Sequence, residues 1–104
     1  MAAYCFFDVR NVTDPVKLGQ YKDSVLATVQ QHGGRYLLLG GNCEPMEGTW
    51  QPVTPVLIQF RTLEQAHNWY NSAAYEPLKA LRLAATEGDA VLIESIPSDF
   101  VTEV

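Results

Sequence analysis

The chain has 104 residues, of which 47% are hydrophobic and 18% are charged. This length and composition predict one folded domain and exclude a disordered chain. The net charge is −5 at pH 7 and the sequence contains no cluster of lysine and arginine, so neither nucleic acid nor an anionic membrane surface is an expected partner.

The N-terminal segment and the cysteines predict a cytoplasmic protein. Residues 1–8 carry no basic leader, and Asp8 interrupts the first apolar run before it reaches the length of a signal peptide. No apolar run approaches the roughly 20 residues that cross a bilayer. Cys5 and Cys43 lie far apart without CxxC spacing, as is typical of thiols in a reducing compartment.

The first two predicted elements are a strand and a helix. Residues 3–9 form a continuous apolar run rich in aromatic residues, which indicates a buried strand. The helix that follows has Thr13 or Asp14 as its N-cap and Pro15 in its first turn. The glycine pair at 33–34 ends it.

The middle of the chain predicts a hairpin. Residues 35–41 form a second strand, and the two glycines at its end indicate either a bulge or a close backbone approach before the strand resumes over residues 43–47. A turn at 48–49 leads back toward a third strand over residues 56–61.

The last third predicts two helical segments and a strand. Thr62 and Gln65 have the spacing of a capping box and open one helix. A second helical pattern covers residues 75–86, and the sequence Glu-Gly-Asp at 87–89 is expected to stop it. Residues 90–96 form the fourth strand, which Pro97 closes.

The resulting β-α-β-β-α-β order predicts an α+β, ferredoxin-like fold with a four-stranded antiparallel sheet in the strand order 4-1-3-2. Residues 1–97 form the single domain of this prediction. Residues 98–104 form a C-terminal tail that either hangs free or docks on a partner.

The predicted strands are apolar on both faces, although the two helical segments can cover only one face of the sheet. A half-solvated antiparallel strand should instead alternate apolar and polar residues. A second copy of the chain, packed sheet on sheet, is the simplest cover for the other face. We therefore expect a homodimer. The apolar runs are residues 4–7, 36–39, 56–58 and 91–93.

Several segments together resemble the domain of unknown function 1330 family. They are residues 33–37 (GGRYL), the glycines at 40–41, residues 47–52 (EGTWQP), Phe60, residues 69–72 (WYNS) and residues 75–82 (YEPLKALR). The resemblance covers roughly residues 3–96 and implies a dimeric α+β barrel. Two positions depart from the family pattern: Gln59 stands where Glu is frequent, and Ala74 stands where an acidic residue is common. If that Glu matters for chemistry, Gln59 has lost its charge.

Asp8 and Arg82 are the first two candidate catalytic residues, because each interrupts an apolar stretch. A buried carboxylate at Asp8 needs donors or a raised pKa; loop capping or an ion pair is one interpretation and a general base in a pocket is the other. Arg82 is either a clamp for a substrate carboxylate or the ion-pair partner of Asp8, Glu47 or Glu94.

His67 is the third candidate catalytic residue, placed at the boundary of a possible pocket, although a surface histidine is the commoner outcome. His32 suits the C-terminal end of its helix, where a partly charged ring is favoured. Neither histidine has a set of further ligands at metal-binding spacing, so we expect no metal. The sequence has no phosphate-binding loop, no GxGxxG after a strand and no GxSxG, so we expect no bound cofactor.

Tyr36, Trp50, Tyr70 and Tyr75 are the candidate ligand-binding residues, although large aromatics are more often core or interface anchors. Trp50 stands out because it follows a turn between two prolines, where it can reach over a partner subunit or cover a cavity.

Two classes of function remain. The first is a cofactor-independent enzyme, of isomerase, monooxygenase or lyase type, that acts on a small apolar molecule in a pocket between sheet and helices; this rests on analogy with other dimeric α+β barrels. The second is a non-catalytic small-molecule-binding or stress-linked dimer. Convergence of Asp8, Arg82 and a tyrosine hydroxyl on a cavity would favour catalysis or binding, whereas mutual pairing would favour a structural role.

Overall fold

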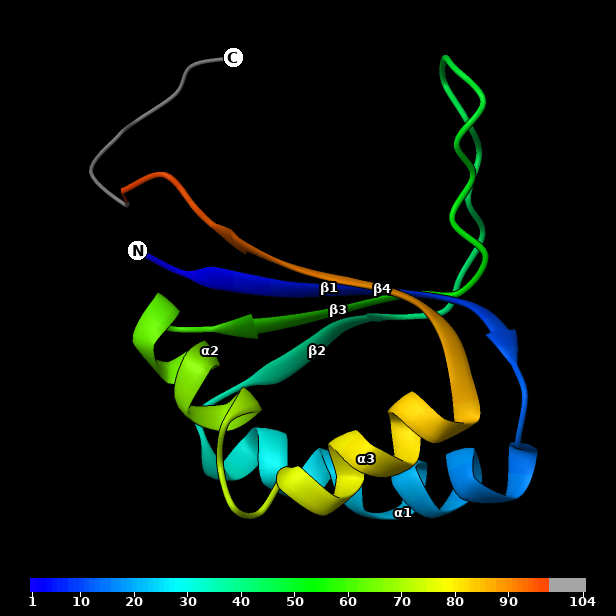
Figure 1. Cartoon of the computed structure of the whole chain (residues 1–104). Helices are drawn as coiled ribbons and strands as arrows, with labels where there is room; N and C mark the ends of the chain where they lie inside the picture. Colours follow the sequence, from blue (N-terminus) through cyan, green and yellow to red (C-terminus); the bar gives the residue numbers. More distant parts are fainter. Residues whose placement is uncertain (98–104) are drawn as a thin grey trace.

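The computed structural model describes residues 1–97 and contains four strands and three helices in this part of the chain (Figure 1). The predicted tail, residues 98–104, lies outside the described residues. The elements in chain order are β1 (Ala3–Val12), α1 (Pro15–Gln31), β2 (Arg35–Leu39), β3 (Pro55–Phe60), α2 (Leu63–Tyr70), α3 (Glu76–Ala85) and β4 (Thr86–Glu94). None of these helices is long and apolar enough to cross a membrane.

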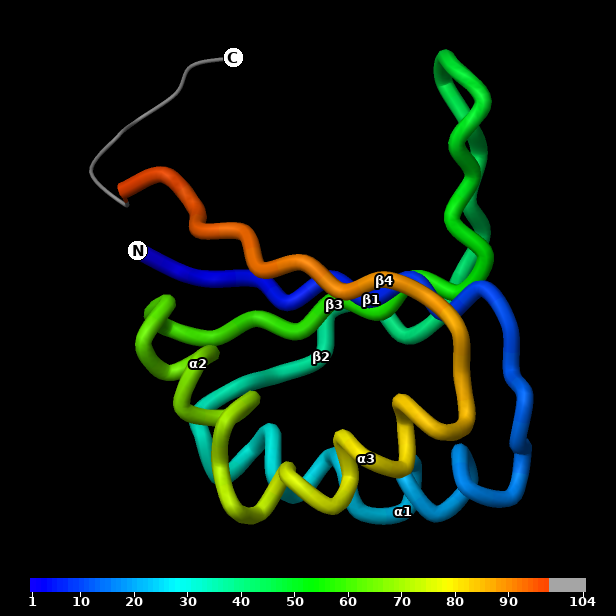
Figure 2. The backbone as a smooth tube through the Cα atoms, in the orientation of Figure 1, coloured from blue at the N-terminus to red at the C-terminus, as the bar shows by residue number. Residues whose placement is uncertain are grey.

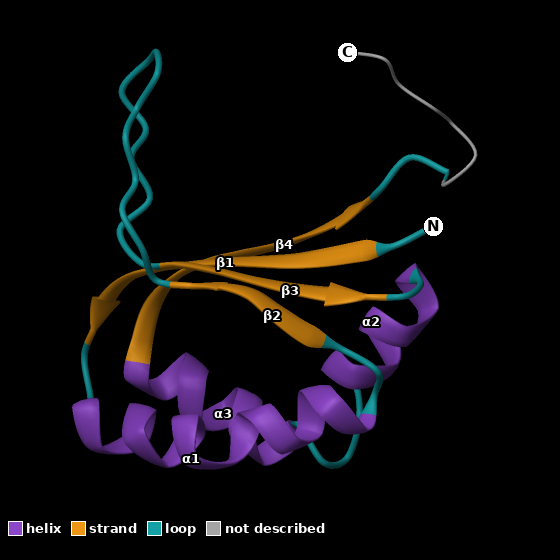
Figure 3. Ribbon diagram, turned by 180° about the vertical axis from the view of Figure 1, so that it is seen from behind, coloured by secondary structure: helices purple, strands orange, loops and turns teal. Residues whose placement is uncertain are grey.

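The four strands form one antiparallel sheet in the order β2-β3-β1-β4, which confirms the predicted ferredoxin-like fold and strand order. All three helices lie on one side of this sheet (Figures 1 and 3). Asp14 and Thr62 cap α1 and α2 by accepting hydrogen bonds from the backbone N–H groups three residues later. The predicted helix starts are therefore confirmed.

The core fills the space between the sheet and the helices. Every second residue at the start of β1, namely Ala3, Cys5 and Phe7, is buried in it, as expected where the side chains of a strand alternate between two faces. Trp69 of α2 is fully buried at its centre, and the ring of Tyr75 lies 4.2 Å away between centroids.

The opposite side of the sheet, which we call the open face, consists of Tyr4, Phe6, Leu57, Val91 and Ile93. The strand register aligns these side chains, because Phe6 pairs with Leu57 and Val91 while Tyr4 pairs with Ile93. Val91 and Ile93 are 52% and 53% exposed. The described structure therefore leaves this apolar surface uncovered over much of its area, as the sequence pattern predicted.

The predicted continuation of the second strand over residues 43–47 is wrong. Residues 40–54, which we call the arm, contain no strand and project from the sheet on the side away from the helices (Figure 2). Gly40 and Gly41 have φ angles of 78° and 118°, a backbone conformation that turns the chain out of the sheet and that only glycine adopts readily. The backbone N–H of Gly40 donates to the carbonyl of Pro55 at 2.8 Å, which closes the base of the arm.

The predicted stop at residues 87–89 is also wrong, because these residues lie inside β4, which begins at Thr86 directly after α3. Gly88 pairs with Val9, and a Cβ atom at Gly88 would collide with the carbonyl oxygen of Asp8. The glycine is thus a point of close strand approach next to a shift in register rather than a turn residue. The longer pairing extends β1 to Val12 rather than to residue 9.

Candidate functional site

A cavity of about 260 Å³ lies between the sheet and α2. We call it the sheet–helix pocket. Its wall is mainly apolar and combines residues of β1, β4 and α2. The residues that line it are Cys5, Phe7, Ala66, His67, Tyr70, Ala90, Val91 and Leu92. A mostly apolar cavity with a few polar groups is the usual form of a small-molecule site.

Three polar side chains reach the sheet–helix pocket. His67 and Tyr70 lie three residues apart on α2, so they share one face of that helix. Cys5 comes from β1, and burial raises the pKa of its thiol to about 11. At neutral pH this thiol is protonated and a weak nucleophile. Of the three side chains, His67 carries the imidazole, the group that enzymes use most often as a general acid or base.

A cluster of tyrosines adjoins the pocket on its α3 side. Tyr75 is fully buried; its hydroxyl lies 3.0 Å from the hydroxyl of Tyr21 and accepts a hydrogen bond of 3.3 Å from Nε of Arg82. Burial, with a smaller contribution from the neighbouring tyrosine, raises the pKa of Tyr21 well above its usual value. Tyr21 therefore stays neutral, and its hydroxyl forms a polar pair with the hydroxyl of Tyr75 inside the core.

Tyr36 of β2 packs against the same core from the side and is not among the residues that line the pocket. Burial raises the pKa of its hydroxyl to about 12.

Asp8 lies on the open-face side of β1, away from the sheet–helix pocket. It is 4% exposed, and its Oδ1 accepts backbone hydrogen bonds from Val53 at 2.9 Å and Thr54 at 3.3 Å. Two donors compensate the burial of this carboxylate. Loop capping, one of the two interpretations of Asp8, accounts for these contacts.

Arg82 lies on the other side of the sheet, with its Cζ atom 5.0 Å from the ring centroid of Phe7. Within residues 1–97 no carboxylate comes within 4.0 Å of its guanidinium, so the structure pairs it with none of Asp8, Glu47 and Glu94. Asp8, Arg82 and a tyrosine hydroxyl do not converge on one cavity. Arg82 donates a hydrogen bond to Tyr75, and Asp8 accepts backbone hydrogen bonds at the base of the arm.

Trp50 belongs to the arm and is 66% exposed. Its ring meets the ring of Phe6 edge to face at 6.3 Å between centroids, so it lies over the open face and not in the sheet–helix pocket. This position leaves most of the indole available to whatever covers the open face.

Comparison with known proteins identifies the family. The sequence profile of the family described as Domain of unknown function (DUF1330) matches residues 2–96. The chain belongs to this family. No curated protein matches this DUF1330 chain in sequence.

Solved structures share the fold of the DUF1330 chain at low sequence identity. RPA0582 of Rhodopseudomonas palustris, described as a protein of unknown function, has a TM-score of 0.70 at 11% identity, with 92% of this chain and 83% of that chain covered. SnoaB of Streptomyces nogalater, a cofactor-independent oxygenase, has a TM-score of 0.57 at 13% identity, with 96% of both chains covered. Rv0793 of Mycobacterium tuberculosis has a TM-score of 0.55 at 8% identity, with 95% and 99% covered. The chain thus shares the ferredoxin-like α+β fold of these proteins.

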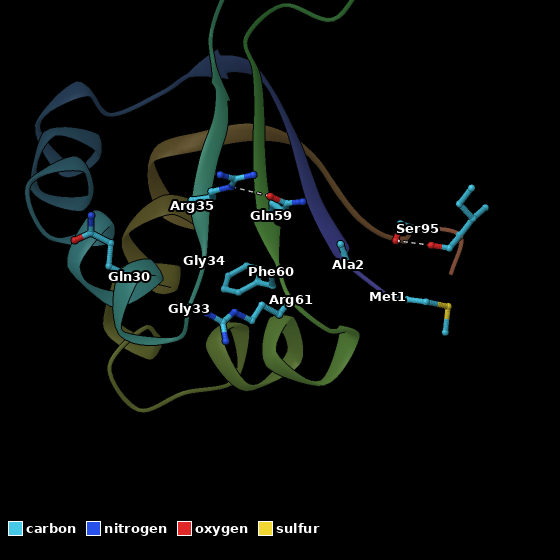
Figure 4. Close-up of a pocket in the computed structure, with 11 residues that line it drawn as sticks. Met1, Ala2, Gln30, Gly33, Gly34, Arg35, Gln59, Phe60, Arg61 and Ser95 are labelled. Carbon is cyan, nitrogen blue, oxygen red and sulfur yellow. Dashed lines mark hydrogen bonds between the residues drawn. The ribbon is translucent and has the colours of Figure 1, made fainter. Parts of the chain in front are cut away.

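A second, open groove lies at the far end of β2 and β3 and includes Arg35, Gln59 and Arg61 (Figure 4). Gln59 accepts a hydrogen bond of 2.8 Å from Nε of Arg35 and donates one of 3.3 Å to the hydroxyl of Tyr4. An amide suits this position because it can accept on one side and donate on the other. This row of three polar side chains crosses three strands of the sheet.

Sequence reasoning placed His67 and Tyr70 among the site candidates but missed Cys5, Phe7 and Leu92. The sequence does not show which alternate residues of β1 face the helices. Cys5 and Phe7 face them, whereas Asp8 and the open-face residues between them point to the other side. Where residues on both faces of a strand are apolar, the sequence pattern does not distinguish the two sets.

Proposed function

We propose that this DUF1330 protein is a homodimer that binds a small, largely apolar molecule in the sheet–helix pocket. The observation that carries the proposal is the pocket itself, an apolar cavity of about 260 Å³ with His67 and Tyr70 in its wall. Its volume lies just below the usual range for drug-sized ligands. The ligand in this proposal therefore has few heavy atoms and one or two polar groups.

The homodimer in this proposal forms through the open face. Sheets that pack face to face lie about 10 Å apart and bury alternate side chains of both layers. Such packing would bury the exposed side chains of Val91 and Ile93. The polar row of Arg35, Gln59 and Tyr4 is hydrogen-bonded within one chain, so a partner can cover it without leaving unpaired groups. The fold shared with dimeric α+β barrel proteins supports the same assembly.

Binding without turnover is the better supported of the two function classes. Asp8 is held by backbone groups of the arm, and Nε of Arg82 is held by Tyr75. Neither side chain lines the pocket. The two free cysteines, Cys5 in the core and Cys43 in the arm, support a place in a reducing compartment such as the cytoplasm.

The binding proposal is tested by filling the pocket. Ala66 lines the cavity and is 1% exposed, so Ala66→Leu places three extra carbons in it. Ala80→Leu adds the same atoms to the exposed face of α3 and is the matched control. The probe is 4-fluorobenzamide, titrated against ¹⁵N-labelled full chain by NMR.

The proposal expects amide shifts at pocket residues such as Leu92 in the wild type and in Ala80→Leu, and their loss in Ala66→Leu. If the shifts fall outside the pocket, or if Ala66→Leu binds as the wild type does, the pocket is not the binding site.

A second candidate function is cofactor-independent catalysis, in which His67 would exchange a proton with the bound molecule. The position of this imidazole in the pocket wall favours it, and the cofactor-independent oxygenase SnoaB shares the fold. In this candidate, turnover of a ligand that co-purifies with the protein is lost in His67→Gln and kept in His32→Gln, the matched control at the C-cap of α1. Equal turnover in both variants would remove His67 from the mechanism.

A further inference from the structure

We propose that the open groove at the far end of β2 and β3, which we call the end groove, receives the arm of a second copy of the chain. This inference rests on the proposed homodimer. It adds the segment that each subunit gives to its partner and the surface that receives this segment.

The arm is a braced projection. At its base the carboxylate of Asp8 accepts the backbone N–H groups of Val53 and Thr54. Farther out, the side-chain amide of Gln51 donates to the backbone carbonyl of Cys43 at 2.9 Å and links the two sides of the arm. A segment that is already held in shape loses less conformational entropy when it binds, so the arm is suited to docking.

The arm exposes large apolar side chains. Met46 is 99% exposed, and Trp50 and Val53 are 66% and 59% exposed. Exposed apolar side chains that gather on one segment are typical of a surface that another protein covers. Docking of the arm would remove these side chains from water.

The arm is longer than the gap between the two sheets of the proposed dimer. It rises on the open-face side of the sheet (Figures 1 and 2). An extended chain from Gly40 to Met46 spans up to about 20 Å, whereas sheets packed face to face lie about 10 Å apart. The outer half of the arm therefore passes the partner's sheet and reaches the level of the partner's helices.

The arm and the end groove lie at opposite ends of the same two strands. The arm joins the last residue of β2 to the first residue of β3, whereas the groove is lined by Arg35 at the start of β2 and Phe60 at the end of β3. A two-fold axis that runs between the packed sheets, perpendicular to the strands, places each end of one sheet over the opposite end of the other. Each arm then meets the end groove of the partner, and the contact occurs twice.

The end groove has room for the outer part of the arm. Its volume is about 740 Å³, and its lining includes Gln30 of α1 and Gly33 as well as the ends of the strands (Figure 4). It therefore extends from the sheet into the helix layer, which is the level that the outer half of the partner's arm reaches.

The charges of the two surfaces are complementary. The arm carries Glu44 and Glu47 and no basic residue. No residue that lines the end groove is acidic, and its two cations are Arg35 and Arg61. Within residues 1–97 no carboxylate lies within 4.0 Å of either guanidinium. In a protein with a net charge of −5, this groove is the surface that suits an acidic segment.

The other two-fold arrangement, with its axis parallel to the strands, brings the arm to the β4 edge at the same end of the sheet. That edge carries Glu87 and Asp89, and Asp89 already pairs with Arg10. Glu44 and Glu47 would meet an excess of negative charge there. The charges therefore favour the end groove.

The test exchanges the charges of the arm and the end groove. The arm variant carries Glu44→Lys and Glu47→Lys, and the groove variant carries Arg35→Glu and Arg61→Glu. Each variant alone brings like charges together at both contacts, so its dimer dissociation constant should rise about 10-fold or more. A mixed dimer of one arm variant and one groove variant restores opposite charges at both contacts.

Native mass spectrometry of an equimolar mixture, with one chain ¹⁵N-labelled, resolves the three dimers. Random pairing makes about half of the dimers mixed, and we expect the mixed dimer to exceed this share clearly. The matched control carries Asp23→Lys and Glu76→Lys at exposed positions of α1 and α3, away from the open face. It has the same net charge as the arm variant, and its mixture with the groove variant should pair at random.

The outcomes separate this inference from the proposed homodimer. Random pairing in both mixtures overturns the arm contact and leaves the homodimer in place. Equal enrichment of the mixed dimer in both mixtures shows attraction through net charge alone and also overturns the arm contact. A monomeric wild type overturns both proposals.

Two further variants complete the test. Residues 98–104 follow the groove residue Ile96 in sequence and include Asp99 and Glu103. If Asp99→Lys with Glu103→Lys, and not the arm variant, pairs preferentially with the groove variant, the arm is not the occupant. If Arg35→Glu disturbs β2, Arg61→Glu alone replaces the groove variant, because Arg61 is exposed and has no ion pair within residues 1–97. Random pairing of this variant with the arm variant would overturn the contact as well.

Discussion

The buried carboxylate of Asp8 is expected to stabilise the fold by capping the base of the arm. Its side chain is 4% exposed and accepts the backbone N–H groups of Val53 and Thr54 at the base of the arm. A hydrogen bond to a charged group contributes about 1.5–3 kcal/mol, and the bond of 3.3 Å to Thr54 is the weaker of the two. Removing the side chain in Asp8→Ala should therefore lower the free energy of unfolding by about 2–4 kcal/mol.

Asp8→Asn is the matched variant, because its amide oxygen can still accept both bonds. Its loss should stay within about 1 kcal/mol, the difference between charged and neutral hydrogen bonds. Urea denaturation of both variants at one protein concentration measures these losses, since the stability of a dimer depends on concentration. Hydrogen exchange at Val53 and Thr54 should accelerate in Asp8→Ala alone.

The two variants also separate structure from catalysis. If Asp8 caps the arm, Asp8→Asn binds ligand in the sheet–helix pocket as the wild type does. Unchanged exchange at both amides in Asp8→Ala would refute the capping role. Loss of turnover in a stable Asp8→Asn dimer would return Asp8 to the catalytic candidates.

Two further predictions concern the core. Thr28→Val removes the acceptor of the hydrogen bond of 3.0 Å from Nε1 of the fully buried Trp69, so the free energy of unfolding measured with urea should fall by about 1–3 kcal/mol. Thr13→Val, at an exposed position, should lower it by less than about 0.5 kcal/mol. Equal decreases in the two variants would contradict the role of the buried bond. With a pKa of about 11, Cys5 has a thiolate fraction of only about 0.1% at pH 8, so iodoacetamide should label Cys43 first by peptide mass spectrometry. Between pH 9 and 11 the folded state keeps a proton on Cys5 that the unfolded state releases, so stability should fall as the pH rises. Equal labelling of the two cysteines in the folded protein would contradict the burial of Cys5.

The fold could be predicted from the sequence because its signals are local or periodic. The caps at Asp14 and Thr62 and the strand order follow from residue types and element order. The two errors came from glycines. Gly40 and Gly41 turn the chain out of the sheet into the arm, and Gly88 allows a close strand contact inside β4. Glycine is found at exits from a sheet, at close strand contacts and in ordinary turns alike. Only its tertiary contacts show which of the three applies.

The candidate site could be predicted only in part. His67 and Tyr70 follow from the amphipathic pattern of α2, and the structure brings them to one pocket. Asp8 and Arg82 lie on opposite sides of the sheet, because Asp8 follows the core residue Phe7 by one position. A shift by one residue along a strand reverses the face, and a run that is apolar on both faces conceals which residues point to the helices.

The central claim is that the open face is covered by a second copy of the chain. A native mass spectrum of the purified full chain at low micromolar concentration tests it most directly. The account predicts a species of twice the 11.6 kDa chain mass, and any additional mass would identify a small molecule retained by the dimer. A monodisperse monomer would contradict the account, because Val91, Ile93 and Trp50 would then face water without a partner.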